Sequence, residues 1–406
     1  MIREVSIENY KSIEKLKLSL GRINIFIGEN GCGKTNILEA IALAAAAASN
    51  KLDNEFLVSR GIRVTEPRLM RSAFDSENSL QEIKIQVNRV QQIEERFKCV
   101  INNDNDPYSN WTYRNAFSLH EESTELLRWS IESDFLNVTK NISEKELLWG
   151  SSNVFQAEQN YLYKIGRYFD DVGTDFRLNK KGFDFKHYLI FSPHYSSLRL
   201  FEKEGQIQPL GINGEGLFKL LQVTARSKSN ELSELHKIKK KMKLIDWFED
   251  FDIPQDLYAT EKRLKIKDRY LNEELAYFDQ RSSNEGFLFL LFYFALFVSE
   301  KTPNFFAVDN IDASLNPRLG RRLIQELVEL AEEYEKQAIL TTHNPAILDG
   351  LNLEDDEQRL FVIYRNKLGH TKARRIFNPE PLEGQKSVKL SEAFLRGYIG
   401  GLPKNF

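Results

Sequence analysis

The feature that most constrains this chain is the glycine-rich segment G-E-N-G-C-G-K-T at residues 28–35. An apolar run at 23–27 precedes it, and a helix-forming run at 37–44 follows it. This order of strand, G-x-x-x-x-G-K-[ST] loop and helix is that of a phosphate-binding P-loop. The glycines allow a tight turn in which successive backbone N–H groups face phosphate oxygens at the helix N-terminus. The segment therefore predicts an α/β fold built around a nucleoside triphosphate site.

Two side chains of this loop have distinct expected roles. Lys34 is expected to reach the β- and γ-phosphates, and the hydroxyl of Thr35 is expected to bind Mg²⁺. The other predicted nucleotide contacts come from neighbouring positions of the same segment: Asn30, Gly31, Cys32, Gly33 and Asn36. ATP and Mg²⁺ are thus the ligands that the sequence predicts.

Two later segments supply further candidates for the same site. Ala307-Val308-Asp309 ends a buried apolar run with an acid, where a Walker B aspartate would hold Mg²⁺. Thr35 and Asp309 are therefore the predicted metal ligands. A second buried run ends in Thr341-Thr342-His343. A histidine at this place is expected to sense the γ-phosphate or to orient water.

Composition and charge are those of an ordinary globular protein. The net charge is −3 and the isoelectric point is near 6.2, so no global basic field attracts nucleic acid. The two cysteines indicate neither a disulfide framework nor a zinc site. The N-terminus lacks a signal-peptide pattern, and the most apolar run, 286–298, is shorter than the roughly 20 residues that span a bilayer. These features predict a cytoplasmic protein without a membrane segment.

The periodicity of apolar residues predicts the organisation of the chain. Alternation at 2–8, 14–20, 82–87 and 97–101 predicts an N-terminal antiparallel portion. In the last third strands alternate with helices, which predicts a parallel core sheet. We expect a single head over 1–406. Its predicted parts are an N-terminal β and P-loop lobe at 1–105, a mixed or helical insertion at 106–188, a second lobe with a basic amphipathic helix (231–248) at 189–280, and a lobe with the remaining motifs at 281–406.

A short polar turn before an apolar helix is a further candidate site. Ser282-Ser283-Asn284-Glu285-Gly286 leads into a run of phenylalanine and leucine. A serine and glycine turn at a helix N-terminus can bind an anion. Within one subunit this turn is expected to lie too far from the P-loop, so a second subunit would supply Ser283, Asn284 and Gly286 to the nucleotide.

In these motifs and in their order, the chain resembles the ABC-type ATPases of the RecF, SMC and OLD group, in the bacterial AAA family ATPase branch. The motifs that carry the resemblance are I-x-x-V-x-I-x-N-Y-K-S-I, G-E-N-G-C-G-K-T-N, S-S-N-E-G-F-L-x-L-L, A-V-D-N-I-D-A-S-L-N-P and T-T-H-N-P. The resemblance implies an ABC-type ATPase head that dimerises, or forms a higher homo-oligomer, with ATP between the P-loop of one subunit and the signature motif of the other. Asn284 and Gly286 would then act in trans, and Ser314-Leu315-Asn316 would form the D-loop at the interface.

Two departures from the family pattern bear on turnover. The family usually has Glu directly after the Walker B aspartate, whereas this chain has Asn310, which holds water but cannot take its proton. Either hydrolysis is slow, or Asp312 or His343 compensates. The signature serine position is occupied by Asn284, or else Ser283 serves it with one extra residue. Gln81 and Gln156 both remain open as the Q-loop glutamine.

The resemblance extends to one subtype and leaves an alternative open. The long coiled coil of SMC proteins and a C-terminal Toprim nuclease are not expected here, which makes the chain similar to the stand-alone ATPase subunits of antiphage systems such as Septu and PARIS. A separately encoded nuclease or toxin would be the partner. The alternative is a RecF-like DNA-repair ATPase that hydrolyses ATP itself. Non-specific DNA binding would use the basic segments at 236–243, 318–322 and 365–375.

Overall fold

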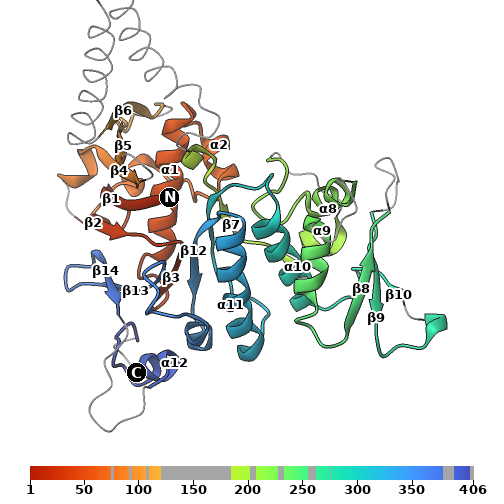
Figure 1. Ribbon diagram of the computed structural model, residues 1–406. Helices are drawn as coiled ribbons and strands as arrows, with labels where there is room; N and C mark the ends of the chain where they lie inside the picture. The colour runs from red at the N-terminus through yellow and green to blue at the C-terminus, as the bar shows by residue number, and fades with distance from the viewer. Residues whose placement is uncertain are drawn as a thin grey trace, which may run out of the picture.

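The computed structural model shows how the chain is arranged around the P-loop (Figure 1). The structure describes residues 1–74, 77–90, 94–106, 109–119, 184–201, 207–226, 233–254, 262–275, 277–377 and 388–402. Most of the predicted insertion at 106–188, together with Gln156, lies outside these described residues. The division of the chain into lobes therefore stays a prediction.

A six-stranded sheet carries the P-loop at the end of one of its central strands. The strands follow the order β14-β13-β3-β12-β11-β7, and all run parallel except the edge strand β14. They are β3 (Ile23–Ile27), β7 (Ile190–Phe191), β11 (Phe305–Val308), β12 (Gln337–Thr342), β13 (Gln358–Arg365) and β14 (Thr371–Ile376). Ile27 lies opposite both Thr342 and Val362, so the carboxyl ends of β3 and β12 meet at one edge. The predicted parallel core sheet is confirmed.

The inner strands of this sheet are largely apolar and buried because both of its faces are covered. Side chains of a strand alternate between the two faces. Ile23, Ile25 and Ile27 therefore join the core that contains α10 (Glu285–Val298) and α11 (Pro317–Glu333). Phe26, between them, joins the core on the opposite face.

A second sheet, entirely antiparallel, forms the N-terminal part of the molecule. Its order is β2-β1-β4-β5-β6. The strands are β1 (Ile2–Tyr10), β2 (Ile13–Ser19), β4 (Ile83–Val90), β5 (Glu94–Asn102) and β6 (Thr112–Leu119). This confirms the predicted N-terminal antiparallel portion, and β6 carries the sheet past residue 105, where we place the end of the first lobe.

The helix that follows the P-loop, α1 (Lys34–Ala48), is enclosed between the two sheets. It contacts β1, β4 and β5 on one side and β12 on the other. A helix that is apolar on every side is a buried one. The small side chains of Ala40, Ala42 and the run 44–47 allow both sheets to approach it closely, and all of them are buried.

Helices cover the other face of the central sheet, and a small sheet, β10-β9-β8, packs on the outer side of these helices (Figure 1). The phenylalanine-rich helix α10 is the centre of this layer and packs against α7, α8, α9 and α11. The other described α-helices and strands are α2 (Asn54–Ser59), α3 (Pro67–Met70), α7 (Tyr195–Leu200), α8 (Leu217–Arg226), α9 (Glu234–Met242), α12 (Leu390–Leu395), β8 (Phe248–Asp252), β9 (Lys265–Asp268) and β10 (Tyr277–Phe278).

The basic amphipathic helix is shorter than the predicted 231–248. Within the described residues it is α9, which ends at Met242, and Phe248 already begins β8. Its lysines are also engaged, because α11 and β8 present acids to them. Ion pairs join Lys237 to Glu333 at 2.5 Å, Lys241 to Glu329 at 2.7 Å and Lys239 to Asp250 at 2.9 Å. These three lysines therefore contribute to intramolecular pairing rather than to a free basic face.

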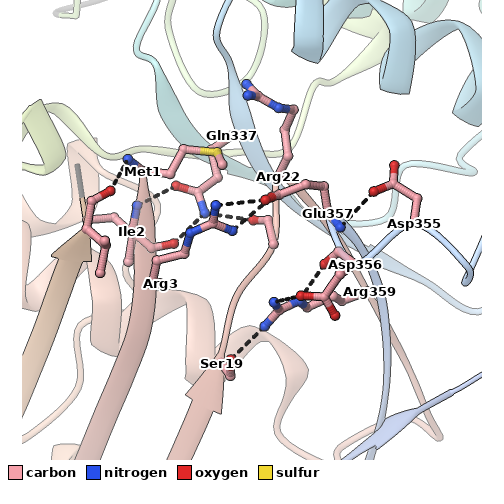
Figure 2. Close-up of polar contacts among 12 residues, drawn as sticks. Met1, Ile2, Arg3, Ser19, Arg22, Gln337, Asp355, Asp356, Glu357 and Arg359 are labelled. Carbon is pink, nitrogen blue, oxygen red and sulfur yellow. Dashed lines mark hydrogen bonds and ion pairs between the residues drawn. The ribbon is translucent and has the colours of Figure 1, made fainter. Parts of the chain in front are cut away.

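A polar seam, drawn in Figure 2, fixes the two sheets to each other at the amino ends of β12 and β13. The P-loop lies at the opposite edge, after the carboxyl end of β3. The side chain of Gln337 accepts from the N–H of Ile2 at 2.9 Å and donates to the carbonyls of Ile2 and Gly21, each at 2.7 Å. Arg3 donates to both carboxylate oxygens of Glu357, at 2.9 and 2.7 Å. Paired backbone and bidentate bonds of this kind fix orientation as well as contact. The seam holds the strand that leads into the P-loop in a set position.

None of the described helices combines the length and the apolar composition needed to cross a bilayer.

Candidate functional site

The candidate site lies at the carboxyl edge of the central sheet. β3, β12 and β11 are neighbours in that order, and each is followed by a segment that the sequence singles out: the P-loop after Ile27, His343 after Thr342 and Asp309 after Val308. Ligands of open parallel sheets bind outside the carboxyl ends of the strands. The fold thus brings these three segments together.

The P-loop owes its shape to a glycine that no other residue can replace. Gly33 caps α1 with a φ of 107°, and a Cβ at this position would lie 2.1 Å from Oγ1 of Thr371. That φ is in the left-handed region, which favours glycine. Nearer the tip of the loop, Asn30 and Gly31 are exposed, and Nε of Arg365 donates to the carbonyl of Gly31 at 2.8 Å. β14 and β13 therefore support the loop from the side.

Lys34 is a buried cation at the start of α1. Its Nζ donates to the carbonyls of Gly28 at 2.8 Å and Glu29 at 3.1 Å, and lies 3.9 Å from Sγ of Cys32. Burial lowers the pKa of Lys34, and the nearby Cys32 and Asp309 partly oppose this. A buried charge is costly unless it is paired. Lys34 is accordingly suited to receive an anion. Burial also raises the pKa of the Cys32 thiol, which makes it a poor nucleophile.

The predicted metal ligands lie side by side. The hydroxyl of Thr35 donates to Oδ2 of Asp309 at 2.9 Å, and the hydroxyl of Thr341 donates to Oδ1 of the same carboxylate. Hydroxyl and carboxylate oxygens are hard donors, and Mg²⁺ is commonly held by one or two such groups together with substrate phosphates and water. The donor set of Thr35 and Asp309 therefore fits Mg²⁺. Thr341 orients the carboxylate, a role the sequence reasoning did not assign.

The positions after the Walker B aspartate have unusual surroundings. Asn310 is exposed, has a φ of 56°, and its N–H donates to the hydroxyl of Thr341 at 2.9 Å. Asparagine tolerates the left-handed region better than most residues. Two residues on, Oδ1 of Asp312 is buried and has no hydrogen-bond partner within the described part of the chain. A buried carboxylate oxygen without a donor is costly, so Asp312 can accept a bond from a water or a ligand.

His343 lies within electrostatic reach of the same groups. Burial by the surrounding protein lowers its pKa, the positive charge of Lys34 lowers it further, and Asp312 and Asp309 oppose the shift. The burial is partial, because His343 still presents surface to solvent. With a pKa below its ordinary value of 6.5, His343 is mainly neutral at pH 7. A neutral imidazole can accept a hydrogen bond from water.

The titration of His343 gives a direct test of this placement. In the wild type its midpoint by proton NMR is expected to lie below 6.5, and in Lys34→Ala it is expected to move upward because the repelling cation is removed. Because this pKa is lower in the folded chain, the unfolded chain binds the proton more readily. His343 therefore lowers the free energy of unfolding as the pH falls through 6.5. Lys240→Ala, on the exposed face of α9, is the control. An unchanged midpoint in Lys34→Ala would place His343 away from Lys34.

The signature turn lies apart, at the N-terminus of α10. Asn284 caps this helix, and its Oδ1 accepts from the N–H of Phe287 at 2.9 Å. Ser283 is buried, and its hydroxyl has no hydrogen-bond partner in the described ranges. The hydroxyl of Ser314, in the predicted D-loop, bonds to Glu285. The structure thus brings the signature turn next to the predicted D-loop. It places Asp309, Asn310, Asp312 and His343 on the side of the P-loop.

Sequence reasoning missed a buried ion cluster beside the P-loop. Glu39 of α1 is fully buried and accepts from Nζ of Lys11 at 2.6 Å and from Nε of Arg63 at 2.7 Å. The sequence signal for this cluster was a single acid, Glu39, within an otherwise apolar part of the helix, because a buried carboxylate needs cations beside it. Its partners come from distant segments and carry no local pattern.

These cations border a hollow next to the loop. The hollow has a volume of about 400 Å³ and opens beside Asn36, which donates to Ser12 at 2.6 Å and accepts from Arg63 at 3.0 Å. Its lining includes Lys11, Ser12, Asn36, Arg63, Phe74 and Arg365. A cavity of this size suits a small ligand, and Asn36, which directly follows Thr35 in the chain, is part of its lining. Gln81, by contrast, contributes its carbonyl to Asn9 at the end of β1.

Comparisons with known proteins agree with this geometry. A family model described as AAA ATPase domain matches residues 1–348. The DNA replication and repair protein RecF of Bacillus thuringiensis (strain Al Hakam) and that of Bacillus cereus (strain B4264) are each 46% identical to the chain over 55 residues, which is 13% of this chain. The match spans only 15% of the length of each RecF.

The fold has a counterpart among solved structures. An SMC head bound to the C-winged helix domain of ScpA superimposes with a TM-score of 0.53 at 14% identity, covering 93% of this chain and 98% of that one. At this identity the likeness concerns the fold alone. It confirms the predicted ABC-type ATPase head with its antiparallel and parallel sheets.

Proposed function

The chain belongs to the AAA ATPase domain family, and from this premise we propose that it binds Mg·ATP at the P-loop and hydrolyses it slowly. The observation that carries the proposal is that Lys34, Thr35 and Asp309 meet at one sheet edge. The distance from Oγ1 of Thr35 to Oδ2 of Asp309 is 2.9 Å. Lys34 offers a buried positive charge to the phosphates. Thr35 and Asp309 would hold Mg²⁺, which when bound offsets the negative charge of the phosphates.

Slow turnover follows from the residues that face the reacting end of such a nucleotide. Asn310 can hold a water by hydrogen bonds but cannot remove its proton. Asp312 offers a buried carboxylate oxygen to which no described residue donates, and His343 is a neutral imidazole near the same charges. We assign proton acceptance to Asp312 or His343, with Asn310 orienting the water. Neither acceptor stands in the position of the usual glutamate.

A dimer around ATP is the second part of the proposal. Ser283, Asn284 and Gly286 would approach the nucleotide of a second copy, with the D-loop, Ser314–Asn316, at the interface. The surroundings of Gly286 support this dimer, because the fold of its own subunit does not require a glycine at this position. A Cβ at Gly286 would meet the Ser314 carbonyl at 3.5 Å and Leu315 at 3.7 Å, which are ordinary contacts.

Replacing this glycine tests the dimer. We expect Gly286→Gln to fold and to keep its Mg·ATP affinity within twofold, while ATP-dependent dimerisation weakens at least tenfold. Calorimetry on the dilute monomer and sedimentation velocity with and without Mg·ATP give the two readouts. Lys240→Gln, on the exposed face of α9, is the matched surface control. Dimerisation of Gly286→Gln at the level of the wild type would contradict an interface through the signature turn.

We also propose that the ATP-bound dimer gates a separately encoded nuclease or toxin. The support is the resemblance of its motifs to the ATPase subunits of antiphage systems. A RecF-like role in repair is not favoured, because the shared segment spans 15% of RecF and three lysines of α9 are held in ion pairs. Co-purification of a nuclease or toxin with the tagged chain from its own host would support gating. A chain that binds DNA and turns over faster with it would support the repair role instead.

A further inference from the structure

A second cavity lies at the edge of the central sheet opposite the nucleotide site. It is bordered by the segments that lead into β7 and β11, so it adjoins the amino ends of strands whose carboxyl ends face the P-loop. Residues of α2 and of the described segment at 207–210 complete its lining. Its volume is about 350 Å³, within the range of small-ligand pockets. Nothing in the proposed ATPase mechanism uses this space.

The wall of this cavity contains a buried arginine. Arg60, which follows α2, is 9% exposed. Its Nη1 donates to the carbonyl of Tyr188 at 2.9 Å, and its guanidinium lies 4.4 Å from the centre of the Phe56 ring. Its Nε has no hydrogen-bond partner among the residues that the structure describes. Among the described residues, one carbonyl and one aromatic ring are the partners of this positive charge, and no acid forms an ion pair with it. Burial lowers the pKa of Arg60 to about 10.

Charged side chains are almost never buried unless they are paired. The cavity next to Arg60 is the place where a missing counter-charge fits. Lys301 adds a second cation to the lining, and Ser59 and Gln208 add hydrogen-bonding groups. Leu189, Pro209 and Phe56 supply apolar surface. One acid, Glu300, also lines the cavity, and its N–H is bonded to the carboxylate of Glu234 at 2.9 Å.

We propose that this cavity is a second ligand site, which binds a small organic anion with an apolar body through Arg60. The anionic group is a phosphomonoester or a carboxylate, both of which match the planar donor fork of a guanidinium. The apolar part of the ligand packs against Leu189 and Pro209. The site is separate from the P-loop, so it is open when nucleotide is bound.

Calorimetry on the full chain saturated with Mg·ADP tests this site, because ADP occupies the P-loop. Phenyl phosphate is titrated in one arm and benzoate in the other, and the arm that binds identifies the anionic group. We expect one molecule bound per chain, at least tenfold weaker binding in Arg60→Met and severalfold weaker binding in Lys301→Met. Arg68→Met, an exposed arginine outside the cavity, is expected to bind as the wild type does.

Thermal unfolding without the anion separates binding from structure. Because Arg60→Met removes a buried charge that has no ion-pair partner in the described part of the chain, its Tm is expected to be no lower than that of the wild type. Absence of binding in both arms would overturn the proposal, and so would undiminished binding by Arg60→Met or a clear fall of its Tm. If Arg60→Met does not fold, Arg60 is structural and the proposal fails, unless Lys301→Met folds and shows the weakened binding described above.

Discussion

Replacing Lys34 by alanine is expected to lower the affinity for Mg·ATP by about 3 kcal/mol, more than 100-fold. The side chain is buried and its charge lies among backbone carbonyls of the P-loop. Truncating one member of a buried charge pair leaves the other without compensation, here the phosphates of the nucleotide. Calorimetric titration of Mg·ATP into both proteins measures the loss.

The control for this prediction has to exclude unfolding of the loop. Lys34 donates to the carbonyls of Gly28 and Glu29, so its removal also leaves these acceptors without a donor. The Tm and near-UV spectrum of Lys34→Ala should therefore be recorded beside those of Lys240→Ala, an exposed lysine of α9. Retained Mg·ATP affinity in a folded Lys34→Ala protein would mean that the nucleotide binds elsewhere.

Replacing Asn310 by glutamate is expected to raise the rate of ATP hydrolysis by about 100-fold, the lower end of what a positioned general base contributes. Asn310 directly follows Asp309, so a carboxylate here would lie where water approaches the metal-bound phosphate. Steady-state phosphate release by wild type and Asn310→Glu at saturating Mg·ATP is the measurement.

The backbone at this position complicates the substitution and suggests the matched control. Asn310 has a φ of 56°, and a residue other than glycine, asparagine or aspartate in the left-handed region costs roughly 1–2 kcal/mol. Asn310→Gln imposes the same strain and the same length without a base. Turnover that rises in Asn310→Glu but not in Asn310→Gln is due to the carboxylate. Equal turnover in the two variants would mean that a glutamate at 310 is no better a base than Asp312 or His343, and that the missing glutamate does not limit turnover.

Much of the fold could be predicted because its signals are local. The bounds of β3 match the apolar run at 23–27, and β11 ends at Val308, directly before Asp309 as expected, since a buried parallel strand is a short continuous apolar segment with a sharp end. The P-loop, with its fixed spacing, identified the strand before it and the helix after it. Parallel pairing then placed the residues after β3, β11 and β12 at one edge.

The parts that could not be predicted depend on contacts between distant segments. Arg63 and Thr371 border the P-loop, yet neither belongs to a motif, and each reaches the loop only through the tertiary fold. The lysines of α9 indicated a basic face, and the acids of α11 that pair with them are about 85 to 96 residues away along the chain. The length of α9 was also overestimated. Phe248 fits the helical spacing of the apolar residues before it, but the backbone at this residue already belongs to β8.

In the candidate site, too, some residues could be predicted from the sequence and others could not. Lys34, Thr35, Asp309 and His343 could be named from sequence, because strand ends in a parallel sheet converge. Thr341 was missed as the residue that orients Asp309, although it stands in the same strand as the predicted histidine motif. For Asn284 and Gly286 the structure gives a position at the start of α10, and their role in trans depends on a second copy.

The most direct test of the proposed function combines oligomeric state with turnover in one sample. Sedimentation velocity of the wild-type chain is recorded with Mg·ADP and with Mg·ATP, and phosphate release is measured in parallel. We expect a monomer with ADP, a dimer with ATP, and turnover well below the roughly 1 to 1,000 per second of typical enzymes. A chain that binds no ATP, or whose sedimentation is the same with either nucleotide, would contradict an ATP-held dimer.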